Sequence, residues 1–235
     1  MLTSILIPVF NEENHIKKIL IKINEVKNIS KEIILINDGS NDNTLKIIQT
    51  ECNGLFDILI NNKKNMGKGF SIREGIKVAR GDVVLIQDAD LEYNPENYQN
   101  LLEPIFLNKY KVVYGSRVLP GGIRSRPSLI DTKIRILANK FLTYLSNKLN
   151  NQKLTDCHTC YKVFLAEVIK KIDLEENGFA FCPEVTAKIS KLGIRIYEVP
   201  IDYFGRTFEE GKKINFIDGF KAIYAILKYN IFIKN

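Results

Sequence analysis

A chain of 235 residues that is 45% apolar and 26% charged has the size and composition of one globular domain, with or without a small appendage. Its net charge of +7 favours anionic partners, namely phosphorylated small molecules, anionic lipid or nucleic acid. Four cysteines are too few for a disulfide framework, and neither an N-terminal signal nor a membrane-length apolar run is visible. We therefore expect a protein of the reducing cytosol without a transmembrane segment.

The first ninety residues alternate between apolar, β-rich runs and segments with helical spacing. Ile16, Ile19, Leu20 and Ile23, for example, recur at the spacing of a helix over 12–26. Repeated strand–helix alternation predicts an α/β fold with a doubly wound, mostly parallel sheet flanked by helices. The strands are expected over 2–10, 31–36, 56–60 and 82–86, and further helices over 43–50 and from the loop at 65–69 to residue 79.

Polar clusters follow these strands at 8–12, 37–40, 65–69 and 88–92. In a doubly wound sheet, ligands bind at the carboxyl ends of the strands. Four polar clusters at equivalent ends favour a phosphate-bearing ligand, although any one of them could be an ordinary polar loop. The sequence has neither the G-x-G-x-x-G fingerprint nor a Walker A motif, so a classical dinucleotide or P-loop site is not expected.

The stretch Gln87-Asp88-Ala89-Asp90-Leu91-Glu92 follows the apolar run at 83–86 directly. Carboxylates spaced Asp-x-Asp on a turn converge, and they repel one another unless a cation lies between them. Oxygen ligands of this kind suit Mg²⁺ or Mn²⁺ with positions left open for phosphate oxygens. A solvated acidic loop is the alternative interpretation.

The second half of the chain continues the alternation. A strand over 111–114 ends at Gly115-Ser116-Arg117, and an arginine at a strand end suits a phosphate. The other expected elements are helices over 95–107, 166–172 and 183–191, strands over 161–165 and 194–199, and a loop with three cations over 205–213.

Two amphipathic helices are predicted, over 130–150 and 214–233. The first has a basic face beside its apolar stripe, which suits an anionic membrane surface, but an ordinary helix with its stripe in the core fits the same pattern. The second is interrupted by Asp218, Lys221 and Lys228, so it should lie on an interface or on the domain rather than span a bilayer.

Cys157-His158-Thr159-Cys160 and Cys182 offer candidate zinc ligands. There is only one Cys-x-x-Cys pair, and an adjacent Cys and His rarely reach one ion, so the spacing argues against zinc.

Six motifs together resemble the family-2 glycosyltransferases, specifically the polyprenyl-phosphate branch that includes dolichol-phosphate mannose synthase. The resemblance covers nearly the whole chain, and the order of the motifs is more specific than any one of them. The motifs are Pro8-Val9-Phe10-Asn11-Glu12-Glu13, Asn37-Asp38-Gly39-Ser40, Asn65-x-Gly67-Lys68-Gly69, Asp88-Ala89-Asp90, Gly115-Ser116-Arg117 and Arg206…Glu210-Gly211-Lys212-Lys213.

The resemblance implies a GT-A fold, a UDP- or GDP-linked sugar donor, and Mg²⁺ or Mn²⁺ held by Asp88, Asp90 and Glu92. It implies catalytic roles for Asp90, Arg117, Arg206 and Lys212, and an acceptor-phosphate site at Arg117, to which Arg135 is added as a candidate. The residues expected to bind the nucleotide sugar are Pro8, Phe10, Asn11, Glu12, Asn37, Asp38, Ser40, Asn65, Gly67, Lys68, Asp88, Ala89 and Asp90.

The implied reaction is inverting, metal-dependent transfer of a sugar (a hexosyltransferase activity) to undecaprenyl or dolichyl monophosphate. The enzyme would act at the inner face of the cytoplasmic membrane as a peripheral protein, aided by a membrane-protein partner or by a second copy of itself. No nucleic-acid partner is expected, because basic and aromatic residues are not interleaved. The expected domains are a catalytic domain over 1–213, which includes the basic helix at 128–150, and a C-terminal amphipathic helix over 214–235.

Two other functions stay open at this point. A family-2 enzyme that elongates a glycan or lipopolysaccharide would transfer to a sugar hydroxyl and would use an acidic general base, for which Glu184 and Asp156 are the candidates. A non-catalytic nucleotide-sugar-binding protein is the second alternative, and the presence of Asp88, Asp90, Arg117 and Arg206 argues against it.

Overall fold

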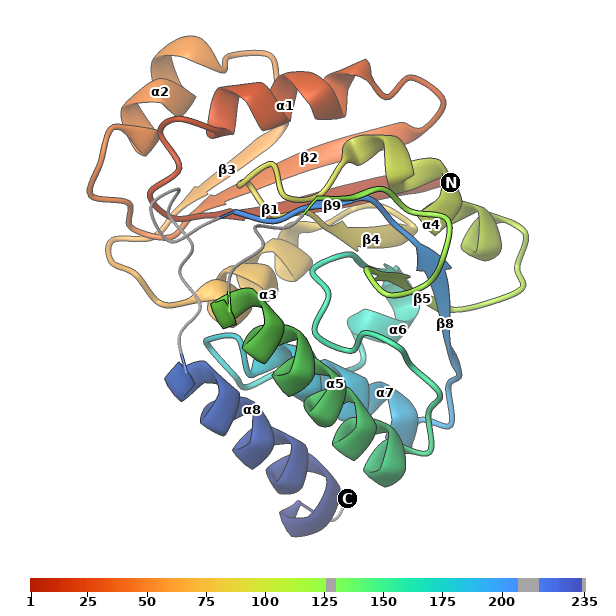
Figure 1. The fold of residues 1–235 in the computed structure, drawn as a ribbon. Coiled ribbons are helices and arrows are strands. Elements are labelled where there is room, and N and C mark those ends of the chain that lie inside the picture. Colours follow the sequence, from red (N-terminus) through yellow and green to blue (C-terminus); the bar gives the residue numbers. More distant parts are fainter. Residues whose placement is uncertain (126–129, 207–215, 234–235) are drawn as a thin grey trace.

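The computed structural model describes residues 1–125, 130–206 and 216–233, with side chains omitted for 130–132 and 216–217. A seven-stranded sheet runs through the centre of the molecule (Figure 1). Its order is β3-β2-β1-β4-β7-β5-β8. The strands are β1 (Leu2–Val9), β2 (Ser30–Asn37), β3 (Ile58–Asn61), β4 (Val83–Ile86), β5 (Val112–Ser116), β7 (Lys162–Leu165) and β8 (Ile196–Pro200).

The sheet is parallel apart from one strand, as the alternating pattern predicts. β1 pairs with β2 on one side and β4 on the other, and β5 pairs with β8, all in parallel. β7 enters between β4 and β5 and is antiparallel to both. The carboxyl ends of β1, β2 and β4 therefore lie at one edge, and the motifs that follow them are brought together there.

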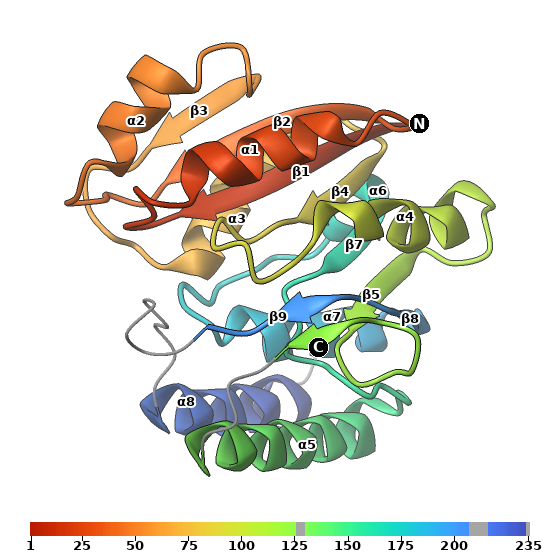
Figure 2. The ribbon, with the colours of Figure 1, turned by 45° about the horizontal axis from the view of Figure 1, so that its top comes forward.

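Helices cover the sheet on both sides. The helices are α1 (Ile16–Glu25), α2 (Thr44–Glu51), α3 (Lys68–Val78), α4 (Tyr98–Phe106), α5 (Ile130–Asn150), α6 (Ala166–Ile169), α7 (Phe181–Lys191) and α8 (Phe216–Leu227), with a 3₁₀ turn at η1 (Pro95–Asn97) and a π turn at η2 (Lys228–Phe232). α1 and α2 lie together over one end of the sheet, whereas α5, α7 and α8 form a separate layer, in which α5 and α8 run side by side (Figure 2).

The main core lies between the sheet and its helices. All four residues of β4 are buried, as expected for a central parallel strand that reads as a continuous apolar run. Ile16, Ile19, Leu20 and Ile23 of α1 are fully buried, so the predicted helical stripe faces the core. Burial of each such side chain stabilises the fold by about 1.5–3 kcal/mol.

Three features differ from the sequence-based prediction. The long C-terminal helix ends at Leu227 and continues as the π turn η2. A helix predicted over 166–172 is only four residues long. A second, two-stranded sheet that the sequence did not indicate pairs β6 (Arg124–Ser125) with β9 (Tyr203–Phe204).

The C-terminal helix packs against α5 and α7. Ala222 and Ile226 form a small apolar cluster with Leu142 of α5. The division into a domain over 1–213 and a helix over 214–235 stays a prediction. No helix among the described residues is both long enough and apolar enough to cross a membrane.

Candidate active site

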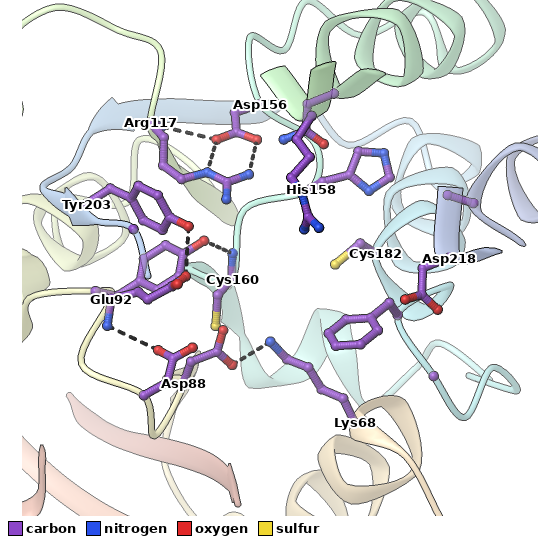
Figure 3. Close-up of a pocket in the computed structure, with 18 of the residues that line it drawn as sticks. Lys68, Asp88, Glu92, Arg117, Asp156, His158, Cys160, Cys182, Tyr203 and Asp218 are labelled. Atoms are coloured by element: carbon purple, nitrogen blue, oxygen red, sulfur yellow. Dashed lines mark hydrogen bonds and ion pairs between the residues drawn. The ribbon is translucent and has the colours of Figure 1, made fainter. Parts of the chain in front are cut away.

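Most of the predicted site residues line one cavity of about 580 Å³ at the carboxyl edge of the sheet (Figure 3). They come from the turns after β1, β2 and β4, from the start of α3, from the end of β5, from α5 and from the segment after β9. The predicted residues that line the cavity are Pro8, Phe10, Glu12, Asp38, Asn65, Gly67, Lys68, Asp88, Ala89, Asp90, Glu92, Arg117, Arg135 and Arg206.

The acidic turn after β4 forms one side of this cavity. Leu91 has a φ of 63°, which is unusual for a residue with a large side chain, and it lets the turn fold back so that Asp90 Oδ1 accepts a hydrogen bond from the Glu92 N–H at 3.1 Å. Burial, and then the charges of Asp88 and Glu92, raise the pKa of Asp90 to about 7. Carboxylates that repel one another in this way favour a cation between them.

Two basic side chains contact these carboxylates. Lys68 Nζ forms an ion pair with Asp88. Arg206 Nη2 lies 3.0 Å from Asp90 Oδ2, and Arg206 Nη1 lies 3.4 Å from Glu12 Oε2. Burial alone would raise the pKa of Asp88, but the Lys68 ammonium outweighs it and the pKa lies below its usual value. Lys68 and Arg206 are therefore placed to neutralise negative charge on this side of the cavity.

Glu92 is engaged differently from the other two acids. Its Oε2 accepts a hydrogen bond from the Tyr203 hydroxyl at 2.7 Å, and its Oε1 accepts one from the Arg206 N–H at 2.9 Å. Within the described ranges, no three Asp, Glu, His or Cys side chains are gathered as metal ligands, and the metal role of Glu92 stays a prediction. The observed role of Glu92 is to anchor the segment that carries Arg206.

Asp88 and Asp90 fit a divalent ion by their chemistry. They offer carboxylate oxygens on a turn, at the edge of a cavity wide enough for a ligand that supplies further oxygens. Mg²⁺ is commonly held by one or two carboxylates together with substrate phosphates, and it does not need a complete protein cage.

The glycine loop at 65–69 is shaped by contacts within the protein. Asp38 accepts hydrogen bonds from the Met66 N–H at 3.0 Å and from the Gly67 N–H at 2.7 Å, so its carboxylate holds this loop in place. A Cβ on Gly69 would lie 2.2 Å from the Glu176 carbonyl oxygen. The glycines of this motif thus allow close packing against a neighbouring loop.

Three residues predicted to bind the nucleotide do not line the cavity: Asn11, Asn37 and Ser40. Asn37 is buried and donates to Asn61 Oδ1 at 2.7 Å between β2 and β3. Ser40 Oγ accepts from the Asn11 N–H at 3.0 Å and joins two turns. These polar side chains support the loops that carry the site. Lys212, predicted to be catalytic, lies outside the described residues.

Arg117 forms the opposite side of the cavity with a partner that the sequence did not indicate. Its guanidinium makes a bidentate pair with Asp156, with Nε to Oδ2 at 2.6 Å and Nη2 to Oδ1 at 2.8 Å. Burial opposes ionisation of Asp156, but Arg117 outweighs it and lowers the pKa of Asp156 to about 2. The Arg117 guanidinium also lies 5.1 Å from the centre of the Tyr203 ring.

The cavity also contains residues that were not predicted to bind the substrates. Some of them were considered only as zinc ligands or as a general base, and they reach the cavity from the turn after β4, from the 156–160 loop, from the segment around α7, from β9 and from α8. They include Tyr93, Asp156, His158, Cys160, Phe179, Cys182, Tyr203 and Asp218.

The two acids that were weighed as general bases are both engaged. Asp156 is paired with Arg117, whereas Glu184 is fully buried, does not line the cavity, and accepts hydrogen bonds from the Glu175 and Glu176 N–H groups and from Lys188. Glu184 is thus a structural residue. The four cysteines are buried free thiols, and no zinc cluster is formed by the residues that the structure describes.

Comparison with known proteins identifies the family. The model of glycosyl transferase family 2 matches residues 4–173. The chain belongs to glycosyl transferase family 2. The protein is therefore a glycosyltransferase, and its fold and its resemblance to the dolichol-phosphate branch are confirmed.

Several family-2 relatives are similar over most of this chain. The UDP-N-acetylglucosamine–dolichyl-phosphate N-acetylglucosaminyltransferase of Methanococcus voltae is 27% identical, over 95% of this chain and 94% of its own length. The dolichol-phosphate mannosyltransferase of Pyrococcus furiosus is 28% identical, over 97% of this chain and 64% of its own length. Both relatives are named for dolichyl-phosphate chemistry.

A solved structure supports the fold. The glucosyl-3-phosphoglycerate synthase of Mycobacterium tuberculosis, solved with Mn²⁺, UDP and glucosyl-3-phosphoglycerate, superposes with a TM-score of 0.73 at 15% identity. The match covers all of this chain and 81% of that one. The GT-A architecture predicted from the sequence agrees with this likeness.

Proposed function

We propose that this glycosyltransferase moves a sugar from a UDP- or GDP-linked donor to a polyprenyl monophosphate such as dolichyl or undecaprenyl phosphate. One observation carries the proposal. On one side of the cavity, Asp88 and Asp90 form ion pairs with Lys68 and Arg206, and Arg117 lies separately on the opposite side. The first side suits a metal-bound diphosphate, and the second suits another phosphate. Dolichyl-phosphate enzymes among the relatives support the same choice.

In this reaction the protein has to position the substrates and neutralise their negative charge, and it does not need a general base. A phosphate monoester is already ionised near pH 7, so its oxygen can attack the anomeric carbon directly. Arg117 would hold that phosphate, and Lys68 and Arg206 would bind the leaving diphosphate. Mg²⁺ or Mn²⁺ at Asp88 and Asp90 would neutralise further charge on the diphosphate. A single displacement of this kind inverts the anomeric centre.

The acceptor is better matched by a phosphate than by a sugar hydroxyl. A hydroxyl acceptor needs a carboxylate that can take its proton. Asp156 is held ionised by Arg117 with a pKa of about 2, which makes it a poor base, and Glu184 is buried away from the cavity. The pairing of Asp156 and the burial of Glu184 favour the lipid-phosphate reaction over glycan elongation.

An apolar face on α5 and α8 fits the lipid partner. Leu137, Phe141 and Tyr144 of α5 are 69%, 56% and 64% exposed, and Phe220 and Tyr224 of α8 are 74% and 62% exposed. Single exposed apolar residues are ordinary, whereas a group of aromatic side chains on two adjacent helices marks an interaction surface. We call these five residues, four of which are aromatic, the aromatic face.

Exposed lysines on α5 and α8 indicate which kind of partner the aromatic face binds. The exposed lysines on the same two helices are Lys133, Lys140, Lys148 and Lys221. Aromatic and basic side chains together suit an anionic bilayer, where each nearby lysine contributes about 1 kcal/mol. We therefore propose peripheral binding at the inner face of the cytoplasmic membrane, which would bring the acceptor lipid to the cavity.

The reaction is tested with purified protein, Mn²⁺, radiolabelled UDP- and GDP-sugars, and farnesyl or undecaprenyl phosphate. Label should pass to the lipid phosphate, and Asp88→Asn should abolish the transfer. Transfer to sugar acceptors and never to the lipid phosphate would contradict the proposal.

Membrane binding is tested separately by co-sedimentation with phosphatidylglycerol-containing vesicles. Phe141→Ser combined with Phe220→Ser should reduce binding at least about tenfold, because two aromatic side chains lose their burial in lipid. Leu107→Ser, at a 53% exposed apolar residue after α4, is the matched control and should bind as the wild type does. Equal binding of both variants would refute the assignment of the aromatic face.

A further inference from the structure

His158 lies in the cavity wall beside the Arg117–Asp156 pair (Figure 3). Its side chain is partly exposed to the cavity, whereas Nε2 is buried and has no hydrogen-bond partner among the described residues. A buried polar atom without a partner costs about 1–3 kcal/mol. Such an atom in the wall of a binding cavity indicates that the ligand supplies the missing partner.

Hydrogen bonds from neighbouring residues fix the backbone of the loop that carries His158. Lys162 is fully buried, and its ammonium donates hydrogen bonds to the Cys157 carbonyl at 3.1 Å and to the Thr159 carbonyl. The Cys157 N–H also donates to Thr143 Oγ1 at 3.4 Å. The backbone on both sides of the imidazole is therefore fixed before any ligand arrives, as a preorganised binding residue requires.

The charges around His158 favour a neutral ring and an anionic ligand. Burial lowers the pKa of His158 to about 4, with Lys162 and Arg117 acting in the same direction and Asp156 opposing them. A neutral imidazole has one N–H donor and one acceptor nitrogen. The positive charges of Lys162 and Arg117 disfavour a protonated imidazole, and for the same reason they favour an anion beside the ring.

We propose that His158 donates a hydrogen bond to the acceptor phosphate, next to the charged contact made by Arg117. The inference rests on the proposed function and adds a residue to its acceptor site. The χ2 torsion of histidine is broad, so a modest rotation of the ring presents a nitrogen to the cavity while the backbone stays in place. A neutral donor adds direction to the phosphate site without adding another buried charge.

The test compares two substitutions with the wild type. His158→Phe keeps a planar ring and removes the N–H, whereas His158→Gln keeps an N–H donor at a similar reach. Isothermal titration of the donor-free enzyme with farnesyl monophosphate should show about 10- to 100-fold weaker binding for His158→Phe, the range for one hydrogen bond to a charged group. His158→Gln should stay within about threefold, since it retains that bond. Thermal denaturation checks that both variants fold.

Kinetics separate the acceptor from the donor. The KM for the nucleotide sugar should be unchanged in His158→Phe, while the KM for the lipid phosphate rises. Equal binding of farnesyl phosphate by the Phe variant and the wild type would overturn the inference and leave the proposed function intact. A rise confined to the donor KM would also overturn it, and a wild type that binds no farnesyl phosphate would overturn both.

A second measurement needs no variant at position 158. The chain has two histidines, so a His15 variant suffices to assign both imidazole signals in a ¹⁵N NMR spectrum. Farnesyl phosphate should shift the ring nitrogens of His158 and leave those of His15 in place. Ring signals of His158 that do not respond at saturating farnesyl phosphate would contradict the contact.

Discussion

Replacing Asp156 by Asn should weaken the fold and the acceptor site together. The Asp156 side chain is 2% exposed and that of Arg117 is 12% exposed, so water screens this ion pair very little. The pKa of Asp156 falls from 3.8 to about 2, and each unit corresponds to about 1.4 kcal/mol. Ionised Asp156 therefore stabilises the fold by about 2 kcal/mol. Asn keeps one acceptor oxygen but leaves Arg117 without a counter-charge, so we expect a loss of about 2–4 kcal/mol.

The pH dependence of this loss has a definite sign. Because the folded pKa of Asp156 is depressed, its contribution is fully present above the unfolded pKa near 3.8 and disappears as the pH falls through the folded value of about 2. Urea denaturation of wild type and Asp156→Asn should give a constant difference in unfolding free energy from pH 5 to 8. The difference should shrink below pH 4.

A surface ion pair supplies the control. Lys17 and Glu51 lie 3.0 Å apart with side chains 48% and 49% exposed, so Glu51→Gln should cost less than about 0.5 kcal/mol. Asp156→Asn should also raise the KM for the lipid phosphate, because Arg117 loses its fixed orientation, and should leave the donor KM nearly unchanged. If Asp156→Asn cost no more than the control and left acceptor binding intact, the reasoning about this pair would be wrong.

Two further substitutions test the proposed metal site on the donor side, and a pair of glycine substitutions tests the packing of the loop at 65–69. Lys68→Met should tighten the binding of Mn²⁺ alone about tenfold in electron paramagnetic resonance titrations, because it removes an ammonium that competes for the same carboxylate. Asp90→Asn should weaken Mn²⁺ binding at least about a hundredfold in the same titration. Gly69→Ala should destabilise the protein by about 1–3 kcal/mol in urea denaturation, since its Cβ would lie 2.2 Å from the Glu176 carbonyl oxygen. Gly219→Ala, with open space around it, should instead be neutral or stabilising by up to about 1 kcal/mol.

The order of the helices and strands could be predicted because each element has a local signal. α1 shows this well, since its buried residues are the ones that recur at helical spacing. The antiparallel direction of β7 has no such signal: its apolar residues would fit a parallel strand equally well, and the direction depends on the path that the chain takes through α5. The two-residue strands β6 and β9 are too short to leave a pattern.

The site divides in the same way. Asp88 and Asp90 could be found because they follow a strand directly, and strand ends in such a sheet converge. His158 and Tyr203 reach the cavity only through the packing of distant segments, and no spacing in the sequence places them there. Asp38 was predicted as a residue that binds the nucleotide sugar. In the structure it also holds the loop at 62–67, because both of its carboxylate oxygens accept hydrogen bonds from that loop.

The charge of the cavity gives a reason for a divalent ion that does not depend on any single ligand residue. Seven carboxylates and five lysine or arginine side chains of the described residues line it, which leaves an excess of two acids. The proposed substrates bring a diphosphate and a phosphate monoester, and the monoester alone carries about 1.5–2 negative charges near pH 7. Anions of that charge would be repelled from an acidic cavity in a medium of low dielectric constant. A divalent cation at Asp88 and Asp90 would cancel this excess of two acids, while the ion pair with Asp156 would keep Arg117 ordered for the proposed acceptor.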